Sequence, residues 1–322
     1  MVVKPAKTIV KQPAIIITGP TAAGKTQLAF DLFDALPVRL ISVDSAQIYR
    51  GMDIGTAKPN KSTLKRYPHA LIDIVEPDEN YNVADFMQAV KRETQAAELA
   101  GQLPVFVGGT TMYIQTLLQG LNDLPAANFQ LRAQIDMDAE KLGWPAIHSQ
   151  LQKLNPEIAA KIAPNDGQRI QRALEIERLA ADQPSKKKYK TDIDTPYEFL
   201  QFVITATSRK QLHQQIEQRA KQMLENGLIQ EVEALYKRYS LSRSSNSMRC
   251  VGYRQVLAML HNELPENELS KAVVQATRQL AKRQLTWMRQ KSGMIWVNVD
   301  WEYKTAFILK RIEAFCKQNA ME

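Results

Sequence analysis

The sequence predicts an α/β protein whose parallel sheet is interrupted by an inserted helical domain and followed by a mainly helical C-terminal part. Three observations lead to this prediction. A glycine-rich octapeptide, GPTAAGKT at residues 19–26, lies between a short apolar run and a helical pattern. Further strand-like apolar runs alternate with amphipathic segments as far as residue 122. Strand patterns then stop and return only at residue 198.

The N-terminal part reads as strand, loop and helix. Residues 14–18, AIIIT, are apolar and β-branched and predict a buried strand, and residues 26–36 have helical spacing. This is the context that a phosphate-binding loop requires. Residues 38–44 and 104–109 predict further strands, with an amphipathic helix over residues 82–101 between them. The alternation predicts a P-loop NTPase-like core, with helices on both faces of a parallel sheet.

Residues 123–196 predict an inserted all-helical domain, because helical patterns follow one another there without a strand. The patterns are ANFQLRAQIDMDAEKLG, WPAIHSQLQKLN, PEIAAKI and NDGQRIQRALEIERLA, and a polar, lysine-rich loop follows them. Residues 1–122 and 197–322 then form the core domain, whose C-terminal part is basic and mostly helical. A strand is expected at residues 198–206 and a late one at residues 294–300.

The composition is that of a soluble globular protein, with 44% hydrophobic and 24% charged residues. No apolar run reaches 18 residues, which excludes a membrane-spanning helix. Cys250 and Cys316 are too few for a disulfide framework or a cysteine metal cluster, so a reducing cytoplasm is expected. The histidines are not spaced as metal ligands. The sequence contains no exposed apolar heptad pattern, so a monomer is expected.

The net charge of +8 is unevenly distributed. Residues 197–322 carry 19 basic against 12 acidic side chains, whereas the rest of the chain is nearly balanced. Residues 271–291 hold six basic residues and no acidic one. A field of one sign on one part of a molecule favours a polyanionic partner such as nucleic acid, although a solvated basic helix is an equal alternative on charge alone.

Phosphate binding is the chemistry that the octapeptide predicts. Its backbone N–H groups would face an anion at the positive end of the following helix. Lys25 would reach the terminal phosphate, and the Thr26 hydroxyl would join a Mg²⁺ shell. The diphosphate-binding residues predicted here are Gly19, Pro20, Thr21, Ala22, Ala23, Gly24, Lys25 and Thr26.

Two further segments follow predicted strands at the edge of the sheet where ligands of open α/β folds bind. Asp44 can act there as a general base or hold a metal, although a turn-capping role for Asp44 and Ser45 is equally compatible with the sequence. Gly108, Gly109 and Thr110 combine close backbone approach with a hydroxyl, and an ordinary strand-to-helix turn is the alternative.

Arg219 falls on the apolar stripe of a predicted helix, three residues after Ile216. A guanidinium in such a place is costly unless it meets an anion. The anion is either a structural aspartate or a bound phosphate, and the phosphate loop favours the second.

Basic residues cluster in three segments that suit RNA. Arg278, Lys282 and Arg289 share one face of a predicted helix, which can present a basic ridge to a phosphate backbone. RCVGYR at residues 249–254 places arginines and a tyrosine around a glycine, which suits stacking of the tyrosine on a base and contact with phosphate. QRIQR at residues 168–172 offers similar chemistry on the insertion. Each segment alone is more often a solvated surface, but three in one chain favour RNA.

Taken together, these segments resemble the tRNA dimethylallyltransferase family, also called tRNA isopentenyltransferases. The resemblance covers nearly the whole chain and is carried by GPTAAGKT, SVDSAQIYRGMDIGTAKP, VGGTTMYIQTLLQGL, NDGQRIQRALEI, IEQRAKQMLENGLIQEVEAL and RCVGYRQVL. It implies transfer of a dimethylallyl group from dimethylallyl diphosphate to N6 of the adenosine 3′-adjacent to the anticodon in tRNA, without consumption of ATP.

The resemblance also implies roles for single residues. Asp44, Thr110 and Arg219 are expected to be catalytic: Asp44 takes the proton of the adenine amine, Thr110 orients Asp44 or a phosphate oxygen, and Arg219 neutralises pyrophosphate together with the loop and Mg²⁺ on Thr26. The adenine is expected to be flipped out of the anticodon stem-loop. The tRNA-binding residues expected are Asp44, Ser45, Ala46, Gln47, Arg132, Gln168, Arg169, Ile170, Gln171, Arg172, Arg249, Cys250, Val251, Gly252, Tyr253, Arg254, Arg278, Lys282, Arg283 and Arg289.

Two other functions are compatible with parts of this pattern. An ATP-dependent kinase of the same fold would hold nucleotide in the loop and would hydrolyse ATP. A non-catalytic RNA-binding regulator would keep the fold and tolerate loss of Asp44.

Overall fold

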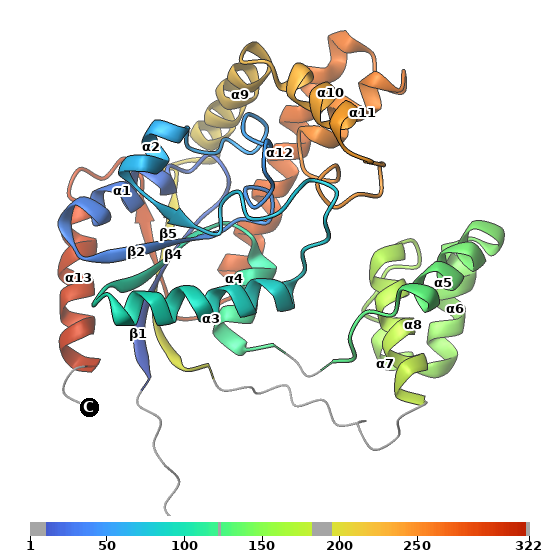
Figure 1. Ribbon diagram of the computed structural model, residues 1–322, viewed down its shortest axis with the longest axis horizontal. Helices are drawn as coiled ribbons and strands as arrows, with labels where there is room; N and C mark the ends of the chain where they lie inside the picture. The colour runs from blue at the N-terminus through green and yellow to red at the C-terminus, as the bar shows by residue number, and fades with distance from the viewer. Residues whose placement is uncertain (1–10, 122–123, 182–194, 320–322) are drawn as a thin grey trace, which may run out of the picture. The chain divides into compact units, whose positions relative to one another are not determined.

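The computed structural model describes residues 11–121, 124–181 and 195–319. Within these residues, the strands form one parallel sheet in the order β3-β2-β4-β1-β5-β6 (Figure 1). The strands are β1 (Gln12–Thr18), β2 (Val38–Val43), β3 (His69–Ala70), β4 (Leu103–Gly108), β5 (Tyr197–Thr205) and β6 (Met294–Asn298). The predicted α/β class is confirmed. β3 was not predicted, because two residues carry no recognisable periodicity.

Alternate residues of the central strands enter two different cores. Ile15 and Ile17 of β1 pack with α1 (Lys25–Ala35) and α13 (Lys304–Asn319) on one face of the sheet. Ala14 and Ile16 pack with α3 (Val83–Leu99) and α4 (Thr111–Gln119) on the other face. Burial on both faces explains why β1 reads as a continuous apolar run. It also fixes the glycine-rich loop at the carboxyl end of an inner strand.

The C-terminal helices build a further core beside the sheet edge. They are α9 (Arg209–Glu225), α10 (Leu228–Arg238), α11 (Tyr253–Leu260) and α12 (Glu266–Arg289). Ile48 and Met52, from the loop that follows β2, are buried among them. The segment after Asp44 is therefore packed against these helices. The short helix α2 (Lys61–Arg66) follows it.

Residues 120–193 form a compact unit that is separate from the unit of residues 1–119 and 194–322. Its described helices are α5 (Phe129–Leu142), α6 (Trp144–Leu154), α7 (Pro156–Ala159) and α8 (Gly167–Ala181). Ile135, Ile147, Leu151 and Leu174 meet in its core. This unit therefore has a hydrophobic core of its own.

Candidate active site at the carboxyl edge of the sheet

The loop between β1 and α1 is shaped by close backbone contacts. A Cβ on Gly19 would lie 2.1 Å from the carbonyl oxygen of Ile204 on β5, so only glycine fits there. Gly24 begins α1 in the left-handed conformation, with φ of 79°. The Lys25 ammonium donates hydrogen bonds to the carbonyl oxygens of Gly19, at 3.0 Å, and Pro20, at 2.8 Å. These bonds hold Lys25 over the loop, as a phosphate-binding lysine requires.

Asp44 directly follows β2 and is oriented by its own turn. Its Oδ1 accepts the backbone N–H groups of Ala46, at 2.9 Å, and Gln47, at 3.3 Å. Its Oδ2 accepts no hydrogen bond from the described part of the chain. One carboxylate oxygen thus sets the orientation, and the other remains available to a ligand.

Thr110 connects the end of β4 to the residue after Asp44. Its backbone N–H donates to the carbonyl oxygen of Val43 at 3.2 Å, and its Oγ1 accepts the Ser45 N–H at 3.0 Å. The same hydroxyl donates to Ser45 Oγ at 3.2 Å. A Cβ on Gly108 would lie 2.1 Å from Val43 O, so this approach of β4 to β2 needs glycine. Of the two sequence-based expectations for Thr110, these bonds favour orientation of the Asp44 turn.

Arg219 reaches the same place from α9. Its Nη2 donates to the carbonyl oxygen of Thr56 at 3.2 Å. Among the described residues, no carboxylate oxygen lies within 4.0 Å of this guanidinium. Burial lowers the pKa of Arg219, and the charge of Asp44 opposes that shift. Of the two anions that the sequence left open for Arg219, a structural aspartate is therefore not in contact among the described residues. A bound phosphate stays a prediction.

Lys25, Arg219 and Asp44 form one electrostatic cluster. Burial lowers the pKa of Lys25 to about 8, with a further lowering from Arg219 and an opposing effect from Asp44. Burial also raises the pKa of the Cys250 thiol to about 12, and Asp44 adds to that shift. Two cations and one carboxylate thus lie close enough at the sheet edge for Arg219 and Asp44 to shift the pKa of Lys25, and for Asp44 to shift that of Arg219. The excess of positive charge suits an anionic ligand.

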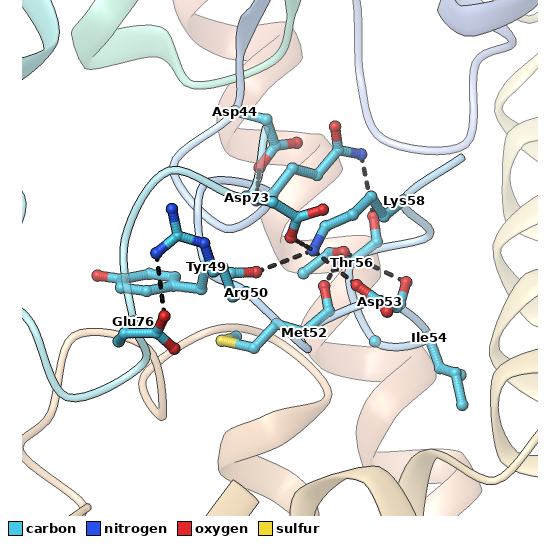
Figure 2. A network of polar contacts seen from close by, with 12 residues as sticks. Asp44, Tyr49, Arg50, Met52, Asp53, Ile54, Thr56, Lys58, Asp73 and Glu76 are labelled. Atoms are coloured by element: carbon cyan, nitrogen blue, oxygen red, sulfur yellow. Dashed lines mark hydrogen bonds and ion pairs between the residues drawn. The ribbon is translucent and has the colours of Figure 1, made fainter. Parts of the chain in front are cut away.

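The segment that carries Asp44 is anchored by a buried lysine that the sequence reading did not single out. Figure 2 shows the Lys58 ammonium between the carboxylates of Asp53 and Asp73. It also donates to the carbonyl oxygen of Tyr49 at 2.8 Å, and its side chain is only 2% exposed. Nothing in the GTAKP string predicts this burial, because both carboxylates come from turns without regular periodicity.

Glu231 on α10 is a second anchor that was missed. Its carboxylate accepts the backbone N–H groups of Asp53, Ile54 and Gly55 at 3.0, 2.7 and 3.2 Å, as well as the Tyr253 hydroxyl at 2.5 Å. The glutamate therefore fixes the same loop through its backbone N–H groups. The three backbone partners are more than 170 residues away from Glu231 in sequence, so spacing could not reveal them.

Comparison with known proteins discriminates between the functions that the sequence left open. A family model described as IPP transferase matches residues 47–291. The tRNA dimethylallyltransferase of Thiobacillus denitrificans is 47% identical over 283 residues, which cover 88% of this chain and 90% of that protein. The chain belongs to the IPP transferase family.

Solved structures agree with this family membership. The tRNA isopentenylpyrophosphate transferase of Bacillus halodurans is 33% identical, with a TM-score of 0.72 and coverage of 97% of this chain and 99% of that one. A eukaryotic dimethylallyltransferase acting on tRNA is 25% identical, with a TM-score of 0.77 and coverage of 96% and 80%. The predicted family and prenyltransferase class are thus confirmed, and the kinase and the non-catalytic regulator are set aside.

The residues expected to bind tRNA near α11 are only partly accessible. Arg249 and Arg254 are exposed, whereas Cys250 and Val251 are half-buried and Gly252 is buried. The Tyr253 side chain is fully buried and bonded to Glu231, which corrects the expectation that it stacks on a base. Its aromatic ring packs in the helical core.

On α12, the expected basic ridge is exposed at Lys282, Arg283 and Arg289. Arg278 is half-buried and forms an ion pair with Glu217 of α9. A shallow hollow of about 390 Å³ lies along the ridge. It is lined by Gln279, Lys282, Arg283, Thr286, Trp287 and Gln290.

In the inserted unit, Arg132 and Arg172 are bound to the buried Glu175. Arg132 makes a bidentate contact through Nε at 2.9 Å and Nη2 at 3.0 Å, and Arg172 donates through Nη1 at 2.5 Å. Burial raises the pKa of Glu175, but the bonds from both arginines outweigh this effect and leave the pKa below its ordinary value. Each arginine side chain is 33% exposed, so part of each guanidinium still meets solvent.

The other expected contacts in this unit differ in exposure. Gln168 and Arg169 are exposed, whereas Gln171 is half-buried and donates to Asp136 at 2.6 Å. Ile170 has no exposed surface, which corrects the expectation that its side chain contacts tRNA. Ile170 and Leu174 are four residues apart, which places them on the same face of a helix. This spacing could have predicted from the sequence that Ile170 is buried.

The described residues contain no group of three or more His, Cys, Asp or Glu side chains that could hold a metal. Thr26 is exposed in the first turn of α1. A metal here would therefore need oxygen atoms from a ligand as well as from the protein. None of the described helices is both long and apolar enough to cross a membrane.

Proposed function

We propose that this protein transfers the dimethylallyl group of dimethylallyl diphosphate to N6 of the adenosine immediately 3′ of the anticodon in tRNA. In the reaction, the bond between the allylic carbon and the diphosphate oxygen breaks and a carbon–N6 bond forms. The proton of N6 passes to Asp44, and diphosphate leaves. One observation carries the proposal: Lys25, Arg219 and Asp44 share one electrostatic cluster at the sheet edge.

The leaving group is the reason for the two cations. Departing diphosphate gains negative charge, and fixed donors aimed at that charge stabilise the transition state most. Lys25 is held over the loop, and Arg219 has no carboxylate partner among the described residues. Both cations are therefore available to the diphosphate oxygens.

Asp44 suits the role of base. An exocyclic adenine amine is a weak nucleophile, so a carboxylate that accepts its proton as the N–C bond forms lowers the barrier. Oδ1 is occupied by the turn, which leaves Oδ2 to face the substrate. Thr110 acts through Ser45 and keeps that turn in place.

The residues present fit a magnesium ion that is bound mainly by substrate. Mg²⁺ commonly takes one or two protein oxygens, several waters and the phosphates of its ligand, and the exposed Thr26 hydroxyl beside the loop supplies one such oxygen. When bound there, the ion would neutralise charge on the diphosphate.

The RNA would be held by exposed basic residues of both units. Arg249, Arg254, Lys282 and Arg289 are exposed on one unit and Arg169 on the other. Such contacts position a phosphate backbone without reading sequence. An adenine stacked in an anticodon loop cannot reach Asp44, so it must be flipped out of the stack.

The test is incubation of the purified protein with unmodified tRNA and labelled dimethylallyl diphosphate, with and without Mg²⁺. We expect label in tRNA and no turnover of ATP. Asp44→Asn keeps the turn acceptor but removes the base, so kcat should fall by about 10²–10⁴-fold. The exposed Asp78→Asn is the matched control. Transfer by Asp44→Asn at the wild-type rate, with tRNA binding intact, would remove Asp44 from the mechanism.

A further inference from the structure

Gln284 of α12 joins two parts of the active site that are far apart in sequence. Its Oε1 accepts the backbone N–H of Thr21 at 2.9 Å, and its Nε2 donates to the carbonyl oxygen of Gly109 at 2.8 Å. The side chain is only 7% exposed. A Cβ on Gly109 would lie 2.6 Å from Nε2, so the glycine provides the room that this amide needs.

The two hydrogen bonds of Gln284, here called the Gln284 bridge, connect it to two different parts of the proposed active site. Thr21 lies within the diphosphate loop, between Gly19 and Gly24. Gly109 precedes Thr110, whose hydroxyl accepts the N–H of Ser45 beside Asp44. One side-chain amide therefore connects the loop that holds the leaving group with the strand end that holds the base.

The amide is chemically well matched to this place. One partner is a donor and the other an acceptor, and glutamine satisfies both with a single planar group. An aliphatic side chain would leave both backbone groups without partners, and an ionised glutamate would lose the bond to Gly109 O.

We propose that Gln284 is a positioning residue that sets the spacing between the diphosphate loop and Asp44. It acts through Thr21 and Gly109 and does not touch the reacting atoms. The proposal rests on the proposed function, because it concerns the alignment of the same reactants. Since exposed Lys282 and Arg283 precede Gln284 on the same helix, the bridge also links the basic ridge to the loop.

The primary test compares wild type, Gln284→Leu and the control Gln275→Leu, an exposed glutamine on the same helix. Misplacement of reactants by about 1 Å costs on the order of 10²-fold in rate, so we expect kcat of Gln284→Leu to fall by about tenfold to a hundredfold. KM for dimethylallyl diphosphate should rise by a smaller factor, and the Kd for tRNA should be unchanged. An unchanged kcat, or a loss confined to tRNA binding, overturns the proposal.

Gln284→Glu keeps the test decisive if the leucine variant does not fold. A protonated carboxyl can donate to Gly109 O, whereas a carboxylate cannot, and burial favours the protonated form. The activity of Gln284→Glu relative to wild type should therefore be higher at pH 6 than at pH 8. A pH-independent ratio overturns the proposal. Failure of wild type and Gln275→Leu to transfer label would instead contradict the proposed function.

Discussion

Half-buried arginines have opposite surroundings in the two units of this molecule. In the inserted unit, Arg132 and Arg172 share the carboxylate of Glu175, which is fully buried. In the core unit, Arg219 donates to a backbone carbonyl, and no carboxylate of the described residues lies within ion-pair distance. The charges of Arg132 and Arg172 are thus paired within the protein, whereas Arg219 has no carboxylate partner among the described residues. We call the first group of arginines closed and the second open.

The difference separates structural from functional cations. Removing a charge from water is costly, and a protein usually offsets this cost with a counter-charge. Where the counter-charge is absent and the cation lies beside Asp44 and Lys25, a ligand anion is the natural partner. The contrast predicts that substitutions in the open group change rates, whereas substitutions in the closed group change stability.

Of the three arginines, Arg219 should give the largest effect on activity when it is replaced by leucine (Arg219→Leu). Loss of one fixed donor to a developing anion costs about 10²–10³-fold in kcat, or about 2.7–4 kcal/mol. The melting temperature should change little, since no carboxylate loses its partner. Transfer assays and thermal melts measure the two quantities, with the exposed Lys221→Met on the same helix as control. A large drop in melting temperature with normal kcat would place Arg219 among the structural arginines.

Glu175→Ala should show the opposite pattern. Removing one member of a buried charge group costs about 3–5 kcal/mol, and we expect the lower end because each arginine is 33% exposed. The loss of stability should appear as unfolding of the inserted unit under milder conditions than in wild type. Hydrogen exchange or limited proteolysis would measure this unfolding. Glu140→Ala, an exposed site on α5, is the control. If Glu175→Ala is as stable as wild type, the ion pairs of Glu175 with Arg132 and Arg172 are not what holds α5 to α8.

Much of the sheet-edge site could be predicted from sequence because parallel strands bring their carboxyl ends together. The octapeptide, Asp44 and Thr110 each follow a strand whose apolar run is visible in the sequence, and the topology then places them at one edge. Arg219 was visible as a cation on an apolar helical stripe. These features depend on local periodicity and on one general rule of α/β folds.

The supporting residues could not be predicted, because their partners are set only by tertiary packing. Lys58, Glu231 and Gln284 look like ordinary polar residues of a loop and two helices. Their partners are backbone groups and carboxylates whose position depends on the whole fold; Gln284 and Thr21 are 263 residues apart. Tyr253 was misread for the same reason, since an aromatic residue in a basic string suits a buried core as well as an RNA surface.

A smaller effect is expected from pH, through Lys25. Its pKa of about 8 in the free protein must rise when a diphosphate binds, because the bound anion favours the charged form. Below pH 8 the lysine is already protonated, so affinity for dimethylallyl diphosphate should be flat there. Above pH 8 binding must take up a proton, and affinity should fall by up to about tenfold per pH unit.

Titration calorimetry of dimethylallyl diphosphate in buffers of different ionisation enthalpy would measure this proton uptake. Lys25→Arg, which stays charged throughout, should bind with an affinity that is nearly independent of pH between 7 and 9. Equal pH dependence in wild type and Lys25→Arg would show that another group titrates.

The smallest effect distinguishes two basic residues of α12. Lys282 is exposed, whereas Arg278 is paired with Glu217 and must leave that partner before it can meet a phosphate. Each phosphate contact contributes about 0.7–0.9 to the slope of log affinity against log salt concentration. Lys282→Ala should therefore reduce the slope for tRNA binding by about that amount, and Arg278→Ala by less. Filter binding at several salt concentrations measures both slopes. An equal or larger reduction for Arg278→Ala would mean that the Glu217 pair opens when tRNA binds, and that pairing within the protein does not by itself mark a cation as structural.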